Sequence, residues 1–430
     1  MLFQPKKFSA KCSTSLDQIP KDGFRLTFDS SESPKIESLT PAGGFYARAL
    51  FKEMKRSDTV PEAGTVVEDW PDFEQRGFML DISRNRVPTM AWLKELIDSL
   101  ARLRYNEFQL YSEHTFAYRD HKIIWQDASP FKAADIREID AYCLDRHIEL
   151  VPNQNTFGHM ERWIKFAPYS HLAECPNGFE HAHTGVMPHG LTLCPSPESV
   201  AFVDSLFEEL LPNFSSGRVN VGGDEPIELG LGRSKDRVAA EGRQKVYLDY
   251  LNEIFALAKK HGRRPMAWAD VILEDPSVVS QLSKDITPVI WGYEADFPFA
   301  EQCPIFQEAG FSGNFYVAPG VGTWFSFGGR MDVARSNIAL AAQEGKRNGA
   351  NGLLLTAWGD EGYHQPWPAL LPGLVMGAQA TWGGEQVGDN LPVHIDTNFY
   401  QGSGAKHGQA ICDLGEIDGM LPQPRLFESF

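Results

Sequence analysis

Short apolar runs of strand type alternate with longer segments of helical period from residue 76 to about residue 382. Each run ends in polar or charged residues, and the segments between them carry apolar side chains at every third or fourth position. The eight expected strands are 77–83, 107–114, 148–155, 218–225, 264–271, 287–294, 314–321 and 352–361. The expected helices include 90–104, 133–147, 199–214, 244–262 and 335–349.

Eight alternations of strand and helix predict an α/β fold, a (β/α)8 TIM barrel. An open doubly wound sheet fits less well, because no GxGxxG fingerprint follows the first expected strand. Polar residues also gather at the C-terminal ends of nearly all the strands, which is where a barrel assembles its active site. The pattern therefore predicts both the fold and the end of the barrel that carries the chemistry.

The chain divides into three expected parts. Residues 1–75 predict a short N-terminal α/β cap with two strands and one helix at about 44–55. Residues 76–385 form the expected catalytic barrel. Residues 386–430 are Gly-rich and polar without helical period, which predicts an irregular C-terminal tail or the start of a truncated region.

Composition narrows the classes of function. Forty Lys and Arg against 57 Asp and Glu give a net charge of −17, which disfavours nucleic acid and acidic membrane surfaces as partners. No apolar run of roughly 18 residues occurs, and the first residues lack the apolar core of a secretory signal, so a cytoplasmic location is the default expectation. Six scattered cysteines without a CxxC pair predict neither a disulfide framework nor a structural zinc site.

The most informative segment is 219–226, with the sequence VNVGGDEP. Asp224 and Glu225 follow a glycine pair, which allows a ligand or the backbone to approach closely. Because neighbouring residues on a strand project to opposite sides, the two carboxylates are poorly placed to flank one bond as an acid and an opposed nucleophile about 5 Å away. One of them is therefore expected to address a different part of the ligand.

Aromatic residues recur at the ends of the last four strands. They are Trp268, Trp291, Trp324 and Trp358. A single tryptophan in a strand is about twice as often a core residue as a ligand wall. Four at corresponding strand ends favour a site, since flat apolar rings beside carboxylates suit the C–H face of a sugar and its hydroxyls.

Six motifs in chain order carry a family resemblance. They are RGFMLDISRNRVPT (76–89), NTFGHMERW (155–163), VNVGGDEP (219–226), MAWADV (266–271), PVIWGYE (288–294) and TAWGDEG (356–362). The set resembles family 20 of the glycoside hydrolases, the β-N-acetylhexosaminidases, over about residues 30–385. The resemblance implies exo-acting, retaining hydrolysis of terminal β-linked GlcNAc or GalNAc from a carbohydrate or glycoconjugate, with no cofactor and no metal. In that mechanism the 2-acetamido oxygen of the sugar attacks the anomeric carbon and forms an oxazolinium ion.

The resemblance also implies a role for each matching residue. Glu225 would protonate the leaving oxygen and later activate water, and Asp224 would hold the acetamido N–H and stabilise developing positive charge. Arg76 matches the arginine that binds ring hydroxyls. His159 matches the histidine that contacts the acid/base carboxylate. Asp360 sits where the family has an acidic residue bound to the outer hydroxyls, a contact that favours exo action.

The remaining matches concern the walls of the site. Trp268, Trp291 and Trp358 match the tryptophans that enclose the acetamido methyl group and support the sugar face. The chain lacks a tyrosine at the usual place near the seventh strand, and Tyr293 is the substitute candidate for the donor to the acetamido carbonyl. Glu113 is expected in the pocket lining at the end of the second strand.

Two other functions compete with this prediction. A zinc-dependent barrel hydrolase would use the histidines and cysteines of segment 170–194, namely His171, His181, His183, His189, Cys175 and Cys194. These residues lie in a long loop rather than on strand ends, which favours a solvated loop over the pocket. A non-catalytic sugar-binding barrel would keep the tryptophans and lose the acid, whereas Glu225 is present.

Overall fold

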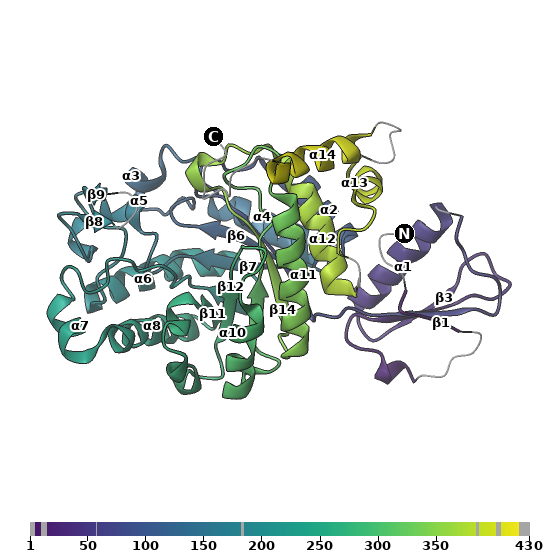
Figure 1. Ribbon diagram of the computed structural model, residues 1–430, viewed down its shortest axis with the longest axis horizontal. Coiled ribbons are helices and arrows are strands. Elements are labelled where there is room, and N and C mark those ends of the chain that lie inside the picture. The colour runs from purple at the N-terminus through teal and green to yellow at the C-terminus, as the bar shows by residue number, and fades with distance from the viewer. Residues whose placement is uncertain are drawn as a thin grey trace.

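Eight parallel strands close into a barrel in the computed structural model, which describes residues 5–9, 15–56, 58–181, 185–383, 387–400 and 406–420 (Figure 1). The strands are β5 (Gln75–Asp81), β6 (Glu107–Ser112), β7 (Glu149–Gln154), β10 (Arg218–Asn220), β11 (Arg264–Trp268), β12 (Thr287–Trp291), β13 (Tyr316–Ala318) and β14 (Gly352–Ala357). Each corresponds to one expected strand. β14 pairs in parallel with β5 and closes the ring, so the TIM-barrel prediction is confirmed.

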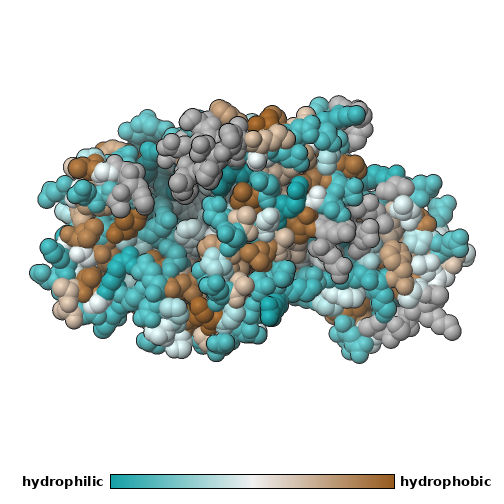
Figure 2. All heavy atoms as spheres, viewed as in Figure 1, coloured by the Kyte–Doolittle hydropathy of each residue, from teal (hydrophilic) through white to brown (hydrophobic). Residues whose placement is uncertain are grey.

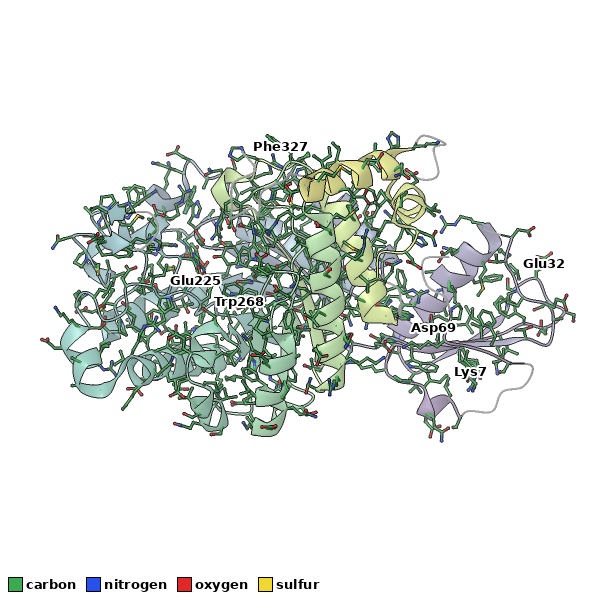
Figure 3. The ribbon with its side chains drawn as sticks, in the orientation of Figure 1. Lys7, Glu32, Asp69, Glu225, Trp268 and Phe327 are labelled. Carbon is green, nitrogen blue, oxygen red and sulfur yellow. The ribbon has the colours of Figure 1, made fainter. Side chains whose placement is uncertain are left out.

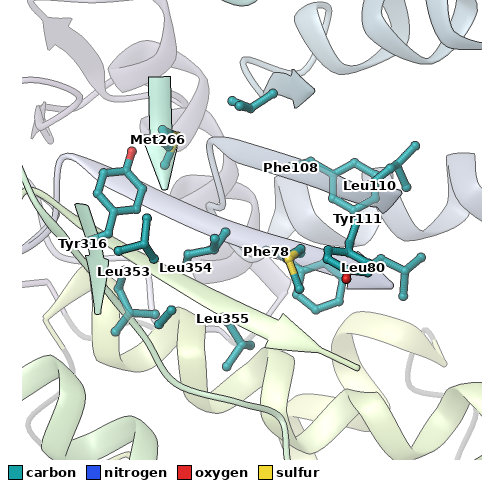
Figure 4. Close-up of a cluster of buried hydrophobic side chains, with 14 of the residues drawn as sticks. Phe78, Leu80, Phe108, Leu110, Tyr111, Met266, Tyr316, Leu353, Leu354 and Leu355 are labelled. Atoms are coloured by element: carbon teal, nitrogen blue, oxygen red, sulfur yellow. The ribbon is translucent and has the colours of Figure 1, made fainter. Parts of the chain in front are cut away.

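The barrel strands are buried on both faces. Leu353, Leu354 and Leu355 follow one another in β14 and all three are fully buried (Figure 4). A parallel strand has the barrel interior on one side and the helical layer on the other, so its apolar residues run on without alternation. That is why the strands appear in the sequence as short continuous apolar runs.

Helices surround the barrel, and five of the longer ones coincide with the expected segments. These are α2 (Met90–Arg102), α4 (Ala133–Leu144), α6 (Pro197–Leu210), α8 (Arg243–Lys260) and α11 (Met331–Arg347). The sequence pattern did not predict α3 (Lys122–Trp125), α5 (Glu161–Ile164), α7 (Lys235–Glu241), α9 (Asp270–Leu273), α10 (Phe299–Phe306) and α12 (Leu371–Trp382). α12 is buried on all sides and so has no polar stripe to reveal its period.

The N-terminal part contains more strands than expected. A four-stranded antiparallel sheet has the order β1-β4-β2-β3, and α1 (Pro41–Arg56) contacts β2 and β3. The strands are β1 (Lys7–Ser9), β2 (Phe24–Thr27), β3 (Lys35–Ser38) and β4 (Val66–Asp69). The two-strand prediction was too low, because β1 and β4 are only three and four residues long and gain their stability from pairing with distant segments.

Buried polar contacts fix this sheet to the barrel. Asp69, at the end of β4, accepts hydrogen bonds from Arg104 Nη1 at 3.0 Å and from Trp382 Nε1 at 2.8 Å. Figure 3 shows Asp69 between the N-terminal sheet and the barrel. Arg76 adds a second link, since its Nη2 donates to the hydroxyl of Tyr46 in α1 at 3.2 Å. The N-terminal sheet therefore covers the end of the barrel at which its strands begin.

The C-terminal segment is helical where it was expected to be irregular. Helices α13 (Leu391–Phe399) and α14 (His407–Met420) pack on α11 and α12, so that prediction was wrong; residues 401–405 and 421–430 lie outside the described part. The glycines that suggested a loop permit close packing instead. A Cβ at Gly415 would lie 3.1 Å from the Cβ of Met331 on α11. Tertiary contact thus compensates for the low helix propensity of glycine.

The surface seen in Figure 2 is mainly hydrophilic with smaller hydrophobic patches, as the net charge suggests. Across the ranges given above, none of the helices has both the length and the apolar character that crossing a bilayer requires.

Candidate active site

A cavity of about 410 Å³ lies at the C-terminal ends of the barrel strands. It is lined by Arg84, His159, Asp224, Glu225, Trp268, Trp291, Gly292, Tyr293, Glu294, Phe297, Trp324, Phe325, Arg330, Trp358 and Asp360. Glu225 and Trp268 lie within the barrel region in Figure 3. The lining of this cavity includes every predicted site residue except Arg76 and Glu113. The cavity therefore gathers side chains that are up to 276 positions apart, from Arg84 to Asp360.

The glycine pair forms the turn that presents the two acids. Gly222 and Gly223 have φ angles of 72° and 92°, and a Cβ at Gly222 would lie 2.1 Å from Oδ1 of Asn155, so no side chain fits there. Asn220 holds the turn by accepting the Gly222 amide at 3.0 Å. Glu225 itself has φ of 44°, a left-handed conformation that costs energy in a residue with a side chain.

One imidazole contacts both acids. Nε2 of His159 lies 3.2 Å from Oδ2 of Asp224 and 3.4 Å from Oε2 of Glu225. Asp224 is 5% exposed, whereas the side chain of Glu225 is 45% exposed and reaches toward the solvent. Burial works against a charge on His159, but the two carboxylates outweigh it and raise its pKa well above the usual value. The hydrogen bond from His159 in turn lowers the pKa of Glu225.

The arginine of the site is Arg84 rather than Arg76. Arg76 is the second residue of β5 and so lies at the opposite end of the barrel, where its Nε donates to the Arg104 carbonyl at 2.8 Å. Its side chain is 1% exposed and does not line the cavity, so the prediction that it binds ring hydroxyls was wrong. Arg84 follows the C-terminal end of the same strand, within the same motif. Its Nε lies 3.8 Å from Oδ1 of Asp360.

Glu113 lies behind the cavity rather than in its lining. It is buried, pairs with Nη1 of Arg84 at 2.9 Å and accepts a hydrogen bond from the Tyr111 hydroxyl at 3.0 Å. Burial raises its pKa, against the opposing charges of Arg84 and His159. The expected contact between Glu113 and a ligand is thus replaced by a contact that orients Arg84.

The walls of the cavity are aromatic, and the four tryptophans that the sequence placed at strand ends all line it. Trp291 stacks on Tyr293 with centroids 5.2 Å apart, and Trp324 meets Tyr293 edge to face at 5.0 Å. Trp358 Nε1 donates to the Tyr293 hydroxyl at 2.7 Å. Because the indole supplies the proton of that bond, the hydroxyl keeps its own proton for another acceptor. Trp268 is 1% exposed and completes the wall.

Asp270 belongs to the site although sequence analysis did not select it. Its Oδ1 accepts the indole N–H of Trp291 at 3.1 Å, and its Oδ2 accepts the backbone amide of Glu225 at 3.2 Å. Burial, together with the neighbouring charge of Asp224, raises its pKa to about 7. Its place two residues after Trp268 in the MAWADV motif was the available signal.

Four lining residues were not selected by the sequence analysis. Glu294 and Phe297 follow β12, and Phe325 and Arg330 follow β13. Nη1 of Arg330 lies 3.7 Å from Oε1 of Glu294. Glu294 ends the PVIWGYE motif, whereas no motif or period distinguishes Phe297, Phe325 and Arg330 in the sequence.

The described part of the histidine-rich loop contains no cluster of side chains that could bind a metal ion. Over these residues no three or more His, Cys, Asp or Glu side chains cluster as metal ligands would, while His183 lies outside the described residues. Cys175 and Cys194 are buried free thiols.

Comparison with known proteins identifies the family. The sequence profile of the catalytic domain of glycosyl hydrolase family 20 matches residues 73–302, which is more than half of the chain and includes the Asp224–Glu225 pair. The chain belongs to glycosyl hydrolase family 20.

Curated relatives of this family 20 chain share about a quarter of its residues. It is 26% identical over 275 residues to a beta-hexosaminidase of Akkermansia muciniphila, covering 57% of this chain and 55% of the relative. It is 26% identical over 234 residues to hexosaminidase D of Homo sapiens, covering 52% of this chain and 46% of the relative. The chain thus spans about half the length of these curated relatives.

Solved structures share the family 20 fold over a larger part of the chain. A beta-N-acetylhexosaminidase crystal structure superposes with a TM-score of 0.70 at 18% identity, covering 99% of this chain and 97% of that one. The chitobiase of Flavobacterium johnsoniae gives a TM-score of 0.67 at 18% identity, covering 92% of this chain and 60% of that one. At this identity the likeness concerns the fold.

Proposed function

We propose that the protein is an exo-acting, retaining β-N-acetylhexosaminidase that removes terminal β-linked GlcNAc or GalNAc with the help of the substrate's own acetamide. The observation that carries the proposal is the contact of Asp224 and Glu225 with the same nitrogen of His159 at the rim of a tryptophan-walled cavity. Two acids on one side of a site do not form the opposed pair of a two-carboxylate glycosidase. They suit a reaction in which the substrate supplies the nucleophile.

Binding would place the sugar among the rings with its outer hydroxyls on charged groups. The tryptophans offer flat apolar surfaces for the C–H face and the acetamido methyl group. Arg84 and Asp360 offer a forked donor and an acceptor for ring hydroxyls. These two charged side chains would close the cavity beyond the terminal sugar, which supports cleavage from the non-reducing end.

The chemical step would use the two acids differently. Protonated Glu225 gives its proton to the leaving oxygen as the bond to the anomeric carbon breaks. The acetamido oxygen bonds to that carbon from the other face, while Asp224 accepts the acetamido N–H and stabilises the positive charge of the oxazolinium ion. Water then attacks the anomeric carbon, Glu225 takes its proton, and the acetamide reforms with net retention of configuration.

Tyr293 would assist the attack from the wall of the cavity. The indole of Trp358 already donates to its hydroxyl oxygen, so the hydroxyl proton is directed to another acceptor. Donation to the acetamido carbonyl would hold the attacking oxygen in line with the anomeric carbon.

Matched substrates test the proposal directly. We expect release of 4-nitrophenol from the β-N-acetylglucosaminide and none above background from the plain β-glucoside, because only the first carries the nucleophile. Replacing the N-acetyl group by N-trifluoroacetyl weakens the attacking oxygen and should lower kcat by more than tenfold, on the order of a 1.4 kcal/mol higher barrier. Equal rates on both amides would contradict substrate assistance.

Variants of the two acids complete the test. Glu225→Gln should remove most turnover of natural glycosides, and Asp224→Asn should slow formation of the cyclic intermediate. Wild-type rates in both variants, or a sugar covalently attached to any side chain in a trapped intermediate, would refute the proposed mechanism.

A further inference from the structure

A second cavity, of about 500 Å³, lies beside the active site on the same end of the barrel. Its lining comes from the segments after β5 and β6 and from α3 and α5. It comprises Ile82, Ser83, Asn85, Arg86, Val87, His114, Thr115, Ile123, Ile124, Asp127, Ala128, Ser129, Arg162, Lys165 and Phe166. Ser83 and Asn85 flank Arg84 of the active site, so the two cavities share one rim. None of these lining residues is used in the proposed reaction.

Positive charge predominates in this cavity although the chain is acidic. Arg86, Arg162 and Lys165 line it against one carboxylate, Asp127, in a protein of net charge −17. Within the described residues, neither Arg162 nor Lys165 has a carboxylate within 4.0 Å, and the hydrogen bond from Nη2 of Arg162 to Oδ1 of Asn85 is long, at 3.4 Å. Cations left unpaired around a concave surface concentrate a positive potential there.

Arg86 is the cationic group that its neighbours hold in place. Arg86 is half-buried, donates through Nη1 to the Gln365 carbonyl at 2.7 Å, and lies over the rings of Tyr363 and Trp367, both at 5.0 Å. Among the described residues, its guanidinium makes no other hydrogen bond. A guanidinium fixed in this way loses little freedom on binding an oxyanion.

A buried histidine lies in the same cavity. His114 is 6% exposed, and its Nδ1 has no hydrogen-bond partner among the described residues. Burial and the charges of Arg162 and Lys165 lower its pKa to about 3, so it lines the cavity as a neutral imidazole. Hydroxyl and amide groups of Ser83, Thr115 and Asn85 offer further polar contacts.

We propose that this cavity is a binding site for an oxyanion, the carboxylate or sulfate of an acidic sugar, beside the hydrolytic site. Its volume lies in the range of small-molecule sites and is large enough for a monosaccharide. The cations supply the charge-assisted hydrogen bonds that such a group requires. A free inorganic anion has the same chemistry, and the two sources are separated below.

Direct binding to the full chain tests the site without reference to hydrolysis. Sodium glucuronate, sodium sulfate and neutral glucose are titrated by calorimetry at constant ionic strength into the wild type and the double variant Arg162→Gln/Lys165→Gln. We expect glucuronate to bind, glucose to bind far more weakly, and the double variant to lose about tenfold or more in affinity for glucuronate. Lys122→Gln, an exposed charge change on α3 outside the lining, should bind glucuronate as the wild type does.

The ligand source follows from the same titrations. Tighter binding of glucuronate than of sulfate supports an acidic sugar, and equal binding supports the site as one for free anions. Failure of both anions to bind the wild type, or equal affinity in the double variant, would overturn the proposal. Hydrolysis of the neutral 4-nitrophenyl N-acetylglucosaminide, measured in parallel, should be the same in all three proteins; its failure would concern the proposed function and not this site.

Discussion

Oδ2 of Asp270 accepts the backbone amide of Glu225 at 3.2 Å. The same carboxylate holds the indole of Trp291 through its other oxygen. Asp270 thus joins one wall of the cavity to the residue proposed as the acid. It also supports Glu225 in a left-handed backbone conformation, which is unfavourable for a residue with a side chain.

Asp270→Asn should impair catalysis by displacing Glu225 and Trp291, since Asp270 itself does not contact the substrate in the proposed reaction. An amide can accept one of the two hydrogen bonds, but its NH2 group then faces the other N–H donor. We expect kcat to fall about tenfold, as removal of a charge-assisted bond predicts, and the pH profile of kcat/KM to lose the contribution of a group with pKa near 7. Glu274→Gln, four residues further on and half exposed, is the control and should leave both unchanged. An unaltered pH profile in Asp270→Asn would contradict this role.

His159→Asn should shift the alkaline limit of activity. The His159 hydrogen bond lowers the pKa of Glu225, and the acid form of Glu225 is lost as the pH rises through that pKa. Without the imidazolium the pKa rises, so the alkaline limb of kcat/KM should move to higher pH. Asparagine tolerates the φ of 56° at this position. A limb that stays in place, or moves to lower pH, would refute the assignment.

Tyr293→Phe should lower kcat/KM by about 10²-fold, because the attacking acetamido oxygen would no longer be held in position. The loss should be seen in single-turnover measurements on the aryl N-acetylglucosaminide. The matched control is Tyr363→Phe, a buried tyrosine outside the active-site cavity whose hydroxyl has no partner in the described part of the chain. If both variants behave alike, the hydroxyl of Tyr293 has no special role.

Asp360 should make sugar binding depend on pH. Burial raises its pKa to about 6, although Arg84 opposes this shift. Below that pH the protonated group loses its charge as an acceptor, so the Ki of N-acetylglucosamine should increase as the pH falls through 6. Asp360→Asn should give a high Ki without this dependence. The same slope in variant and wild type would assign the titration to another group.

Asp69→Ala should destabilise the whole chain without touching the site. It removes a buried carboxylate that holds Arg104 and Trp382, and loss of one partner of a buried ion pair costs about 3 kcal/mol. Urea unfolding measures this cost. Glu241→Ala, which removes an exposed partner of Arg237, should cost less than about 1 kcal/mol. Equal midpoints for the two variants would show that the junction with the N-terminal sheet contributes nothing.

The sequence by itself determined the barrel and the acids and tryptophans that gather at its rim. Strand and helix periods are local properties, so apolar runs such as 352–357 reveal buried strands, and residues that follow their ends must meet at one face of a closed barrel. The placement of Asp224, Glu225 and Trp358 in the cavity follows from that rule alone.

Only the tertiary structure decided which neighbours act together. Arg76 and Arg84 share one motif, and closure of the barrel places one at each end of β5. Asp270 contacts Glu225 although the two residues are 45 positions apart. Arg86 and Arg162 both line the second cavity. Glycines in α14 form a helix because α11 packs against them. Distances between remote residues depend on how the strands close and the helices pack, and no local pattern of side chains encodes them.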